Sequence, residues 1–456
     1  MELKKREIQP DYSEFVRRLF ADPNRQENYD VSRNVTFQIT NQCNLRCSYC
    51  YEHNKSSSSM DIYTGKKCVD TLLNMYCSND NEFINRNTKA LVLDFIGGEP
   101  LLEAKLIEGI CDYYFDECFR RNIPLAPFTR ISFATNGQLW FSPEAQHLIE
   151  KYHEIMSVTV SIDGVQSLHD KYRIDQYGQG SFEKSYLAFL DGKKKYGWAN
   201  SKMTFTPGST KYLFDSVKMM IQNGCKEIHC NYAYEPMYTK NDATDIYLEL
   251  MKLSDYLVEN KSDVLVSILD EQLGGKVDLV NENKNYCGGT GNMLAFAPDG
   301  RAYPCIRYMP ISIGEEKSSK ICIGNCYEGI YKKDNEKAIK TDLDAITYTS
   351  QSPQKCIDCP VSQGCGWCSG YNFELYGTPN KRYTGICYAH KGRVLASCYY
   401  YLKRYLVIGD VPPKAINLPN DEVRDIVGEE NAKALFDLQE QAARKILSVT
   451  RDGGDI

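Results

Sequence analysis

The sequence has no long apolar run, no basic excess and no secretory signal. No window holds about 18 successive apolar residues, so we expect no membrane span. The 54 lysines and arginines are outnumbered by 60 aspartates and glutamates, which argues against a nucleic-acid partner. The start, MELKKREIQP, lacks the apolar segment of a signal peptide. We therefore expect a cytoplasmic protein without a membrane partner.

Histidine is scarce, with 6 residues, whereas cysteine is abundant, with 19 among 456. This density is below that of a disulfide scaffold. A cytoplasmic chain of this size needs no disulfides to hold its core. We expect the cysteines to bind metal, to carry redox chemistry or to be buried.

Six segments with apolar alternation or short apolar runs predict strands, and each is followed by a segment of helical character. The six strands are expected at 35–39, 90–96, 130–134, 156–162, 202–206 and 226–232. Repeated strand–helix units predict an α/β fold with a parallel sheet, closed as a partial (β/α)6 TIM-like barrel. Polar and glycine-rich clusters follow the strands, where ligands bind in such folds.

The rest of the chain divides by composition. The five expected parts are an N-terminal extension (1–33), the strand–helix core (34–240), a helical connector (241–286), a cysteine-rich domain (287–400) and a helical tail (401–456). Smaller expectations are a short helix near Phe15 and Leu19, a helix capped by Thr64, and an amphipathic terminal helix carrying Leu435, Leu438, Ala442 and Ile446 before a frayed end.

Three closely spaced cysteines follow the first strand: Cys43, Cys47 and Cys50, in CNLRCSYC. Structural zinc takes four ligands, whereas three suit an iron–sulfur cluster with one open iron; buried or zinc-bound cysteines remain the alternative. The segment TNQCNLRCSYC, with Tyr49 before the last cysteine, resembles the signature of radical S-adenosylmethionine (SAM) enzymes. The resemblance implies a [4Fe–4S] cluster that binds SAM and cleaves it to methionine and a 5′-deoxyadenosyl radical.

Three further motifs resemble the SAM site of that family. GGEP follows the second strand, TNG the third, and SIDG the fourth. The resemblance implies that GGEP receives the SAM amino group, that TNG contacts the ribose, and that a serine and an arginine bind the carboxylate. Without the resemblance, the alternatives are ordinary turns and a surface arginine. The residues so assigned are Tyr49, Gly97, Gly98, Glu99, Pro100, Thr135, Asn136, Ser161, Asp163 and Arg173. His169 is expected to be structural.

Seven cysteines mark the C-terminal third: Cys287, Cys305, Cys356, Cys359, Cys365, Cys368 and Cys387. Paired C-x2-C units also suit zinc. The whole pattern resembles the SPASM domain, which carries two auxiliary [4Fe–4S] clusters and would bring the total to three. By that correspondence Cys356, Cys359, Cys365 and Cys387 hold the second auxiliary cluster, and Cys287, Cys305 and Cys368 the first. Cys365 and Cys368 are separated by two residues where the family has three.

By the same resemblance, fully ligated relatives have an eighth cysteine shortly before the position of Cys287, where it completes the first auxiliary cluster. Residues 231–286 of this chain contain none. An open iron there would allow a substrate thiolate to bind. Cys322 or Cys326 could close it instead, although we favour structural roles for both. The other cysteines show no ligand spacing and are expected to be buried: Cys68, Cys77, Cys111, Cys118, Cys225, Cys230 and Cys398.

The resemblance covers residues 34–400 and implies a radical SAM maturase of a ribosomally made peptide. Ile306 follows Cys305 where sulfatase-maturating relatives have an aspartate, so sulfatase maturation is disfavoured. The open iron favours thioether formation on a cysteine-containing peptide, as in sactipeptide or ranthipeptide maturases. The alternatives are carbon–carbon or carbon–oxygen cross-linking, epimerisation, sulfatase maturation, or a non-catalytic zinc or iron–sulfur protein.

The expected partners are the precursor peptide and a reductant protein such as a flavodoxin or ferredoxin. Only about 33 residues precede the first strand, too few for the N-terminal recognition domain of many such maturases. Recognition is then left to a separate protein or to the core and tail.

Overall fold

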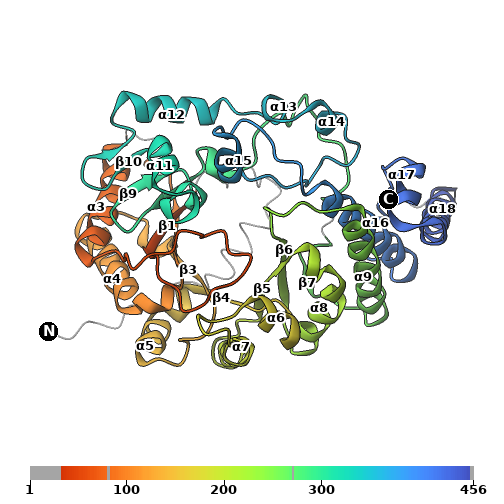
Figure 1. Cartoon of the computed structure of the whole chain (residues 1–456), viewed down its shortest axis with the longest axis horizontal. Helices are drawn as coiled ribbons and strands as arrows, with labels where there is room; N and C mark the ends of the chain where they lie inside the picture. Colours follow the sequence, from red (N-terminus) through yellow and green to blue (C-terminus); the bar gives the residue numbers. More distant parts are fainter. Residues whose placement is uncertain (1–31, 80–82, 270–271, 452–456) are drawn as a thin grey trace. The chain divides into compact units, whose positions relative to one another are not determined.

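The computed structural model describes residues 32–79, 83–269 and 272–451 (Figure 1). The short helix expected near Phe15 and the frayed end lie outside these residues. The chain forms two compact units. Among the described residues, unit 1 comprises those within 32–44, 50–159 and 286–345, and unit 2 those within 45–49, 160–285 and 346–451.

The sheet of unit 1 is built around β1 (Ser32–Thr40). β1 pairs in parallel with β2 (Ala90–Gly97) on one side, and β2 pairs in parallel with β3 (Arg130–Thr135). On its other side β1 pairs in parallel with β8 (Met293–Phe296), which the sequence did not predict. Antiparallel pairing then adds β9 (Arg301–Tyr303), β10 (Gly324–Asn325) and β11 (Gly329–Ile330).

The apolar alternation of β1 has the expected cause. Val35, Phe37 and Ile39 are fully buried, and the Phe37 ring packs 5.3 Å from Phe95 and 5.7 Å from Phe296. One face of β1 therefore forms the core of unit 1, and the alternate residues, including Gln38, lie on the opposite face.

Helices follow the strands of unit 1 as expected, and α3 and α4 lie beside one another in Figure 1. They are α3 (Ile62–Ser78), α4 (Ala104–Arg120), α5 (Pro143–Tyr152), α10 (Pro310–Ile313), α11 (Glu315–Ser318) and α12 (Asp334–Asp344), with short 3-10 turns at Pro100–Glu103, Ala126–Phe128, His153–Ile155, Gly288–Thr290, Ile306–Tyr308 and Ser319–Ile321. The expected cap of α3 was wrong. Asp61 is the cap, because its carboxylate accepts from the Thr64 amide at 2.7 Å.

Unit 2 continues the strand–helix order. Strand β4 (Met156–Ser161) ends in this unit, where its last residues pair in parallel with β5 (Asn200–Phe205). β5 pairs in parallel with β6 (Glu227–Tyr232), and β6 with β7 (Leu265–Val266). All six expected strands are present, and parallel strands followed by helices confirm the α/β class. Closure into a six-unit barrel stays a prediction.

The helices of unit 2 include its longest elements. They are α6 (Gln166–Tyr172), α7 (Phe182–Tyr196), α8 (Leu213–Gln222), α9 (Lys240–Glu259), α13 (Tyr348–Gln351), α14 (Gln354–Ile357), α15 (Ser369–Tyr376), α16 (Cys387–Val407), α17 (Asn420–Val427) and α18 (Glu429–Arg451), with a 3-10 turn at Pro207–Tyr212. α16 packs on α9 at Gly392, where a Cβ atom would lie 2.5 Å from the Ala243 carbonyl oxygen.

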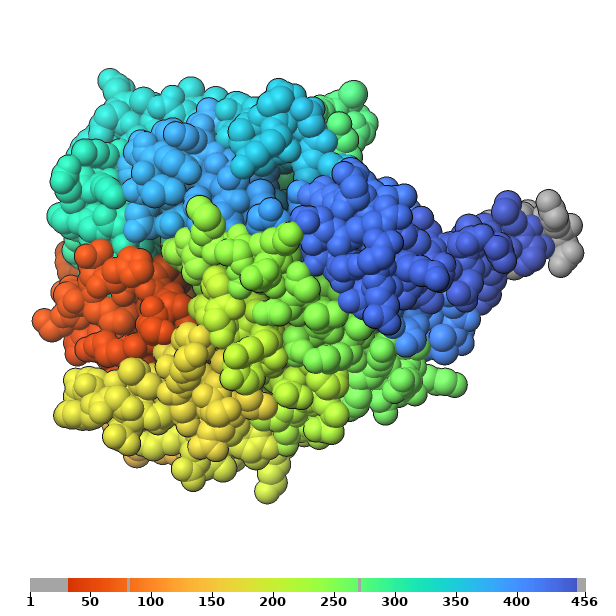
Figure 2. All heavy atoms as spheres, turned by 45° about the vertical axis from the view of Figure 1, so that its right-hand side comes forward, coloured from red at the N-terminus to blue at the C-terminus, as the bar shows by residue number. Residues whose placement is uncertain are grey.

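The terminal helix is amphipathic as expected, with Leu435 and Ala442 buried. Figure 2 shows the end of the chain, which carries α17 and α18 and is coloured blue, projecting from the rest of unit 2. Within the expected helical connector the structure has one helix, α9; residues 260–269 and 272–285 form none. In the described part of the chain, no helix combines the length and apolarity that crossing a membrane requires.

Candidate active site

The cysteine loop that follows β1 contributes to both units. Its two ends belong to unit 1, where the Asn41 amide donates to the Ser58 carbonyl at 2.8 Å. Its middle, residues 45–49, belongs to unit 2. There the Arg46 amide donates to the Ile174 carbonyl at 2.6 Å and the Ser48 amide to the Tyr172 carbonyl at 3.0 Å. Cys43, Cys47 and Cys50 are all partly exposed.

The double glycine after β2 is required by a close backbone approach. The Gly98 amide donates to the Thr40 carbonyl at 3.0 Å. A Cβ atom on Gly98 would lie 2.2 Å from the Gln42 carbonyl oxygen and 2.7 Å from the Cys43 Cβ. No side chain fits there, so the glycine allows the GGEP turn to pack against the start of the cysteine loop.

The Glu99 carboxylate ties GGEP to the turn after β3. It is 1% exposed and accepts from the Thr135 hydroxyl at 2.6 Å, the Asn136 amide at 2.8 Å and the Leu101 amide at 3.1 Å. Asn136 in turn donates through Nδ2 to Asn44 Oδ1 at 2.7 Å. One buried carboxylate thus links two turns of the expected SAM site, and Asn136 links them to the cysteine loop.

The unit 2 part of the expected SAM site is a buried charged triad. The Arg173 guanidinium donates through Nη1 to the Tyr49 hydroxyl at 2.7 Å, and that hydroxyl donates to the Asp163 carboxylate. Asp163 also accepts from the Thr204 amide at 3.0 Å. Burial raises the pKa of Asp163, and Arg173 opposes that rise. The triad fixes Arg173, which follows α6, beside Asp163, two residues after Ser161 ends β4.

One polar atom of this triad has no partner. Arg173 is 9% exposed, and its Nε is buried without a hydrogen bond. A buried guanidinium N–H without an acceptor costs free energy. A carboxylate such as that of SAM would supply the acceptor, so the residues present fit that group.

His169 is buried with both ring nitrogens engaged. Nδ1 accepts from the Asp163 amide at 3.3 Å, and Nε2 lies 3.0 Å from the Ser181 hydroxyl. Burial lowers its pKa to about 3. These contacts agree with the expected structural role.

A lysine beside the cysteine loop was missed by the sequence analysis. Lys55 Nζ lies 3.3 Å from Cys50 Sγ and 3.5 Å from the Glu52 carboxylate. Burial lowers the pKa of Lys55, but the neighbouring Cys50 and Glu52 raise it by more. A cation at this position stabilises a thiolate. A lysine five residues after a cysteine follows no pattern that could have revealed it.

Arg382 is the corresponding cation among the C-terminal cysteines of unit 2. It is 5% exposed and donates through Nη2 to the carbonyl oxygens of Cys365 at 2.9 Å and Gly366 at 3.4 Å. The rings of Trp367 and Tyr348 lie 4.8 and 5.4 Å from its guanidinium carbon. Its Nη1 is buried without a partner.

The environment of Arg382 fits an anionic cluster. Cys356 and Cys365 both interact electrostatically with Arg382. Burial raises the pKa of Cys365 to about 11, and Arg382 opposes that rise. A buried cation needs a counter-charge. Thiolates bound to iron and sulfide would supply it, so these cysteines suit an iron–sulfur centre.

The cysteines expected to hold the first auxiliary cluster are divided between the units. Cys287 and Cys305 belong to unit 1, and Cys368 belongs to unit 2. Cys305 is buried, and a Cβ atom on Gly289 would lie 3.0 Å from its Sγ. Cys368 caps the start of α15, where its Sγ accepts from the Tyr371 amide at 3.4 Å.

Cys322 and Cys326 make contacts of a structural kind. The Cys322 thiol donates to the Gly324 carbonyl at 3.3 Å. Cys326 is buried and hydrogen-bonded to the thiol of Cys68 in α3. Of the seven cysteines expected to be buried, six are; Cys77 is exposed, because it lies in the last turn of α3 on the solvent face.

Over the ranges 32–79, 83–269 and 272–451, no three His, Cys, Asp or Glu side chains converge on a point where a single metal ion would be held. A four-iron cluster is larger than one ion and spreads its thiolates around a cube. The fit of these residues to iron–sulfur clusters and SAM is therefore tested by three observations: the charges of Lys55 and Arg382, and the unpartnered N–H of Arg173.

Comparisons with known proteins define the class. No family model matches the chain. It is 25% identical over 386 residues to the radical SAM cyclopropyl synthase TigE of Paramaledivibacter caminithermalis, covering 81% of this chain and 73% of that protein. It is 22% identical over 368 residues to the subtilosin biosynthesis protein AlbA of Bacillus subtilis, covering 77% of this chain and 71% of that protein. TigE is a radical SAM enzyme and AlbA a protein of bacteriocin biosynthesis, and this chain is similar to both over more than two thirds of its length.

A third relative and two solved structures complete the comparison. An uncharacterised protein of Methanocaldococcus jannaschii is 33% identical over 204 residues, covering 44% of this chain and 62% of that protein, so this match spans less than two thirds of the relative. The structure of anSMEcpe with bound AdoMet matches at a TM-score of 0.59 and 19% identity, covering 79% of this chain and 95% of that one. The structure of Streptococcus suis SuiB bound to its precursor peptide matches at a TM-score of 0.53 and 13% identity, covering 85% of this chain and 83% of that one. These likenesses show that the chain shares the fold of these two structures.

Proposed function

We propose that the chain is a radical SAM maturase that forms a thioether between a cysteine sulfur and a carbon of a ribosomally made peptide. The observation that carries the radical SAM part is the triad of Tyr49, Asp163 and Arg173. It links the middle of the cysteine loop to a buried guanidinium whose free N–H suits the carboxylate of SAM.

In this proposal the cysteine loop holds a [4Fe–4S] cluster through Cys43, Cys47 and Cys50. The SAM-binding residues are Tyr49, Gly97, Gly98, Glu99, Pro100, Thr135, Asn136, Ser161, Asp163 and Arg173. When bound, the cluster and SAM supply a 5′-deoxyadenosyl radical that removes a hydrogen atom from the peptide. Arg173 binds the SAM carboxylate, Glu99 holds the GGEP and TNG turns in register, and Lys55 offsets the thiolate charge of Cys50.

The C-terminal region, residues 287–400, is proposed to be a SPASM domain with two auxiliary clusters, making three in all. Arg382 provides the counter-charge for the second of them. The other proposed parts are the extension 1–33, the core 34–240, the connector 241–286 and the tail 401–456. A cytoplasmic location and a flavodoxin or ferredoxin as reductant belong to the same proposal.

Two observations support a thioether in particular. The first auxiliary set lacks an eighth cysteine in residues 231–286, which leaves a place for a substrate thiolate. AlbA, a bacteriocin biosynthesis protein, is similar over 368 residues. SuiB bound to a precursor peptide has the same fold, which supports a peptide substrate.

A second candidate is carbon–carbon bond formation in a peptide. The match to the cyclopropyl synthase is longer and closer than that to AlbA, at 386 residues and 25% identity. The two products differ chemically. A thioether consumes the thiol of a cysteine, whereas a cyclopropane does not.

The experiment uses the full chain prepared without oxygen and loaded with iron and sulfide. Cysteine-containing peptides encoded beside its gene are incubated with SAM and dithionite, then alkylated and analysed by mass spectrometry. We expect a peptide that has lost two hydrogens and can no longer be alkylated at one cysteine. A product with every thiol still alkylated supports the carbon–carbon alternative. The control is the triple variant Cys43→Ala, Cys47→Ala, Cys50→Ala, which should leave the peptide unchanged.

A further inference from the structure

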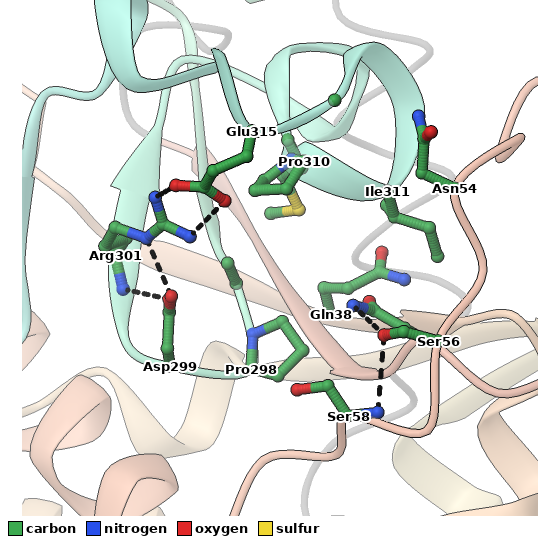
Figure 3. A pocket seen from close by; sticks show the side chains of 14 residues that line it. Gln38, Asn54, Ser56, Ser58, Pro298, Asp299, Arg301, Pro310, Ile311 and Glu315 are labelled. Carbon is green, nitrogen blue, oxygen red and sulfur yellow. Dashed lines mark hydrogen bonds and ion pairs between the residues drawn. The ribbon is translucent and has the colours of Figure 1, made fainter. Parts of the chain in front are cut away.

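Unit 1 contains a cavity with both polar and apolar walls that the proposed function does not use. Its volume is about 330 Å³, within the range of small-molecule sites. Its walls come from four segments of unit 1 (Figure 3). They are the end of β1, the part of the cysteine loop at 54–58, the turn after β8 and the segment 309–315. Gln38 lies between the loop carrying Ser56 and Ser58 and the segment carrying Pro310 and Ile311.

Gln38 presents an unsatisfied acceptor in this cavity. Its side chain is fully buried, and Nε2 donates to the Thr40 carbonyl at 3.1 Å and to the Glu52 carboxylate at 3.4 Å. Both partners are acceptors, so the amide group cannot be reversed. Oε1 is therefore fixed in its position, and it has no hydrogen-bond partner. A buried acceptor without a donor costs free energy that a ligand N–H would recover.

The charges of the cavity lie at its rim and neutralise one another in part. Arg301 donates through Nη2 to Glu315 at 3.0 Å and through Nε to Asp299 at 2.7 Å, and both carboxylates are at least half exposed (Figure 3). The inner part holds Gln38 and the apolar side chain of Ile311. A carboxylate placed there would face the Gln38 oxygen, which is itself an acceptor. An ammonium would lose its hydration beside that one neutral acceptor, because the nearby Glu52 carboxylate already pairs with Lys55. An uncharged donor avoids that cost.

A chain of polar contacts joins the cavity to the cysteine loop. Gln38 contacts Glu52, Glu52 lies 3.5 Å from Lys55, and Lys55 lies 3.3 Å from Cys50 Sγ. All four residues belong to unit 1. Gln38 is thus connected to Cys50 through Glu52 and Lys55.

We propose that this cavity binds a carboxamide side chain, asparagine or glutamine, of the peptide substrate. Its amide N–H donates to Gln38 Oε1, its stem packs on Ile311 and Met309, and the exposed Ser56 and Ser58 border its entrance. The inference rests on the proposed function in one respect, that the ligand is part of a peptide.

The test measures binding of N-acetyl-asparagine N-methylamide to the iron-loaded full chain by saturation-transfer NMR. The Gln38→Met variant should weaken binding about fivefold to tenfold, the value of one net hydrogen bond. Gln351→Met is the matched control, because Gln351 is also a buried glutamine with an unpartnered amide but does not line the cavity. It should bind the probe as the unaltered chain does.

Ser58→Trp supplies a second variant at an exposed position, where folding is not at stake. The indole should fill the entrance and abolish binding. The lysine and aspartate analogues of the probe should bind at least about fivefold more weakly than the asparagine probe. Equal binding to Gln38→Met, stronger binding of a charged analogue, or no binding of any probe would overturn the inference.

Formation of 5′-deoxyadenosine is measured on the same samples. SAM cleavage without probe binding refutes the carboxamide site and leaves the proposed function standing. Probe binding without SAM cleavage refutes the proposed function and supports the carboxamide site.

Discussion

The guanidinium of Arg173 donates a 2.7 Å hydrogen bond to the hydroxyl of Tyr49. Tyr49 precedes the last cysteine of the loop by one residue, and Arg173 follows helix α6 in unit 2. The contact explains why an aromatic with a hydroxyl stands in the cysteine motif. It holds in place the side chain that we assign to the carboxylate of SAM.

The Tyr49→Phe variant should therefore bind SAM about tenfold more weakly, because a hydrogen bond to a charged group contributes about 1.5–3 kcal/mol. The measurement is equilibrium binding of SAM to the iron-loaded protein. Tyr172→Phe is the matched control, since its ring lies 6.3 Å from that of Tyr49 but its hydroxyl is outside the triad. Equal weakening in both variants would contradict the role of the hydroxyl.

Replacing Glu99 by glutamine should disrupt the two turns after β2 and β3. The carboxylate accepts from three donors, and an amide would turn an NH2 group toward at least one of them. We expect SAM cleavage to fall about tenfold or more, the effect of losing one to two kcal/mol of positioning. Glu103→Gln, one turn further on and without a cap hydrogen bond, should retain activity. Full activity in Glu99→Gln would show that the turns need no carboxylate.

Arg382 should set the reduction potential of one auxiliary cluster. A buried cation stabilises the reduced, more negative form, so Arg382→Met should make that potential more negative by about 60 mV, a tenfold change for one electron. An EPR-monitored redox titration measures this. Lys381→Met, at the exposed neighbouring position, should leave the potential unchanged. An unaltered potential in Arg382→Met with full iron content would argue against the assignment.

The pKa of His169, lowered to about 3 by burial, predicts a pH-dependent stability. The unfolded chain takes up this proton near pH 6.5 and the folded chain does not. The free energy of unfolding therefore falls as pH drops below 6.5. Between pH 7.5 and 5, the free energy of unfolding of His169→Gln should therefore fall by about 2 kcal/mol less than that of the unaltered chain.

Urea unfolding at the two pH values, compared between the variant and the unaltered chain, measures that difference. His53→Gln is the control, because His53 is exposed. If His169→Gln loses as much stability on acidification as the unaltered chain, His169 is protonated in the folded protein.

Much of the fold followed from local patterns. Val35, Phe37 and Ile39 alternate because one face of β1 packs on the core, and all six expected strands are present. Strand β8 was missed because it is only four residues long and lies among cysteines, glycines and prolines. Its pairing with β1 joins residues 259 positions apart (Asn34 with Met293), and local periodicity carries no such information.

The candidate site was predictable where residues are contiguous. The cysteine loop, GGEP and TNG stand in short motifs, and the structure links the GGEP and TNG turns through Glu99. Lys55, Arg382 and Gln38 were not predicted, since each acts through a neighbour that the fold supplies. Their importance lies in burial and in missing partners, which only coordinates reveal.

The most direct test of the account is 5′-deoxyadenosine formation from SAM by the iron-loaded chain under dithionite. We expect the unaltered chain to form it and the Cys43, Cys47, Cys50 triple alanine variant to form none. Cleavage by both proteins, or by neither when the unaltered chain carries its full iron, would contradict the assignment of a radical SAM centre to the loop after β1.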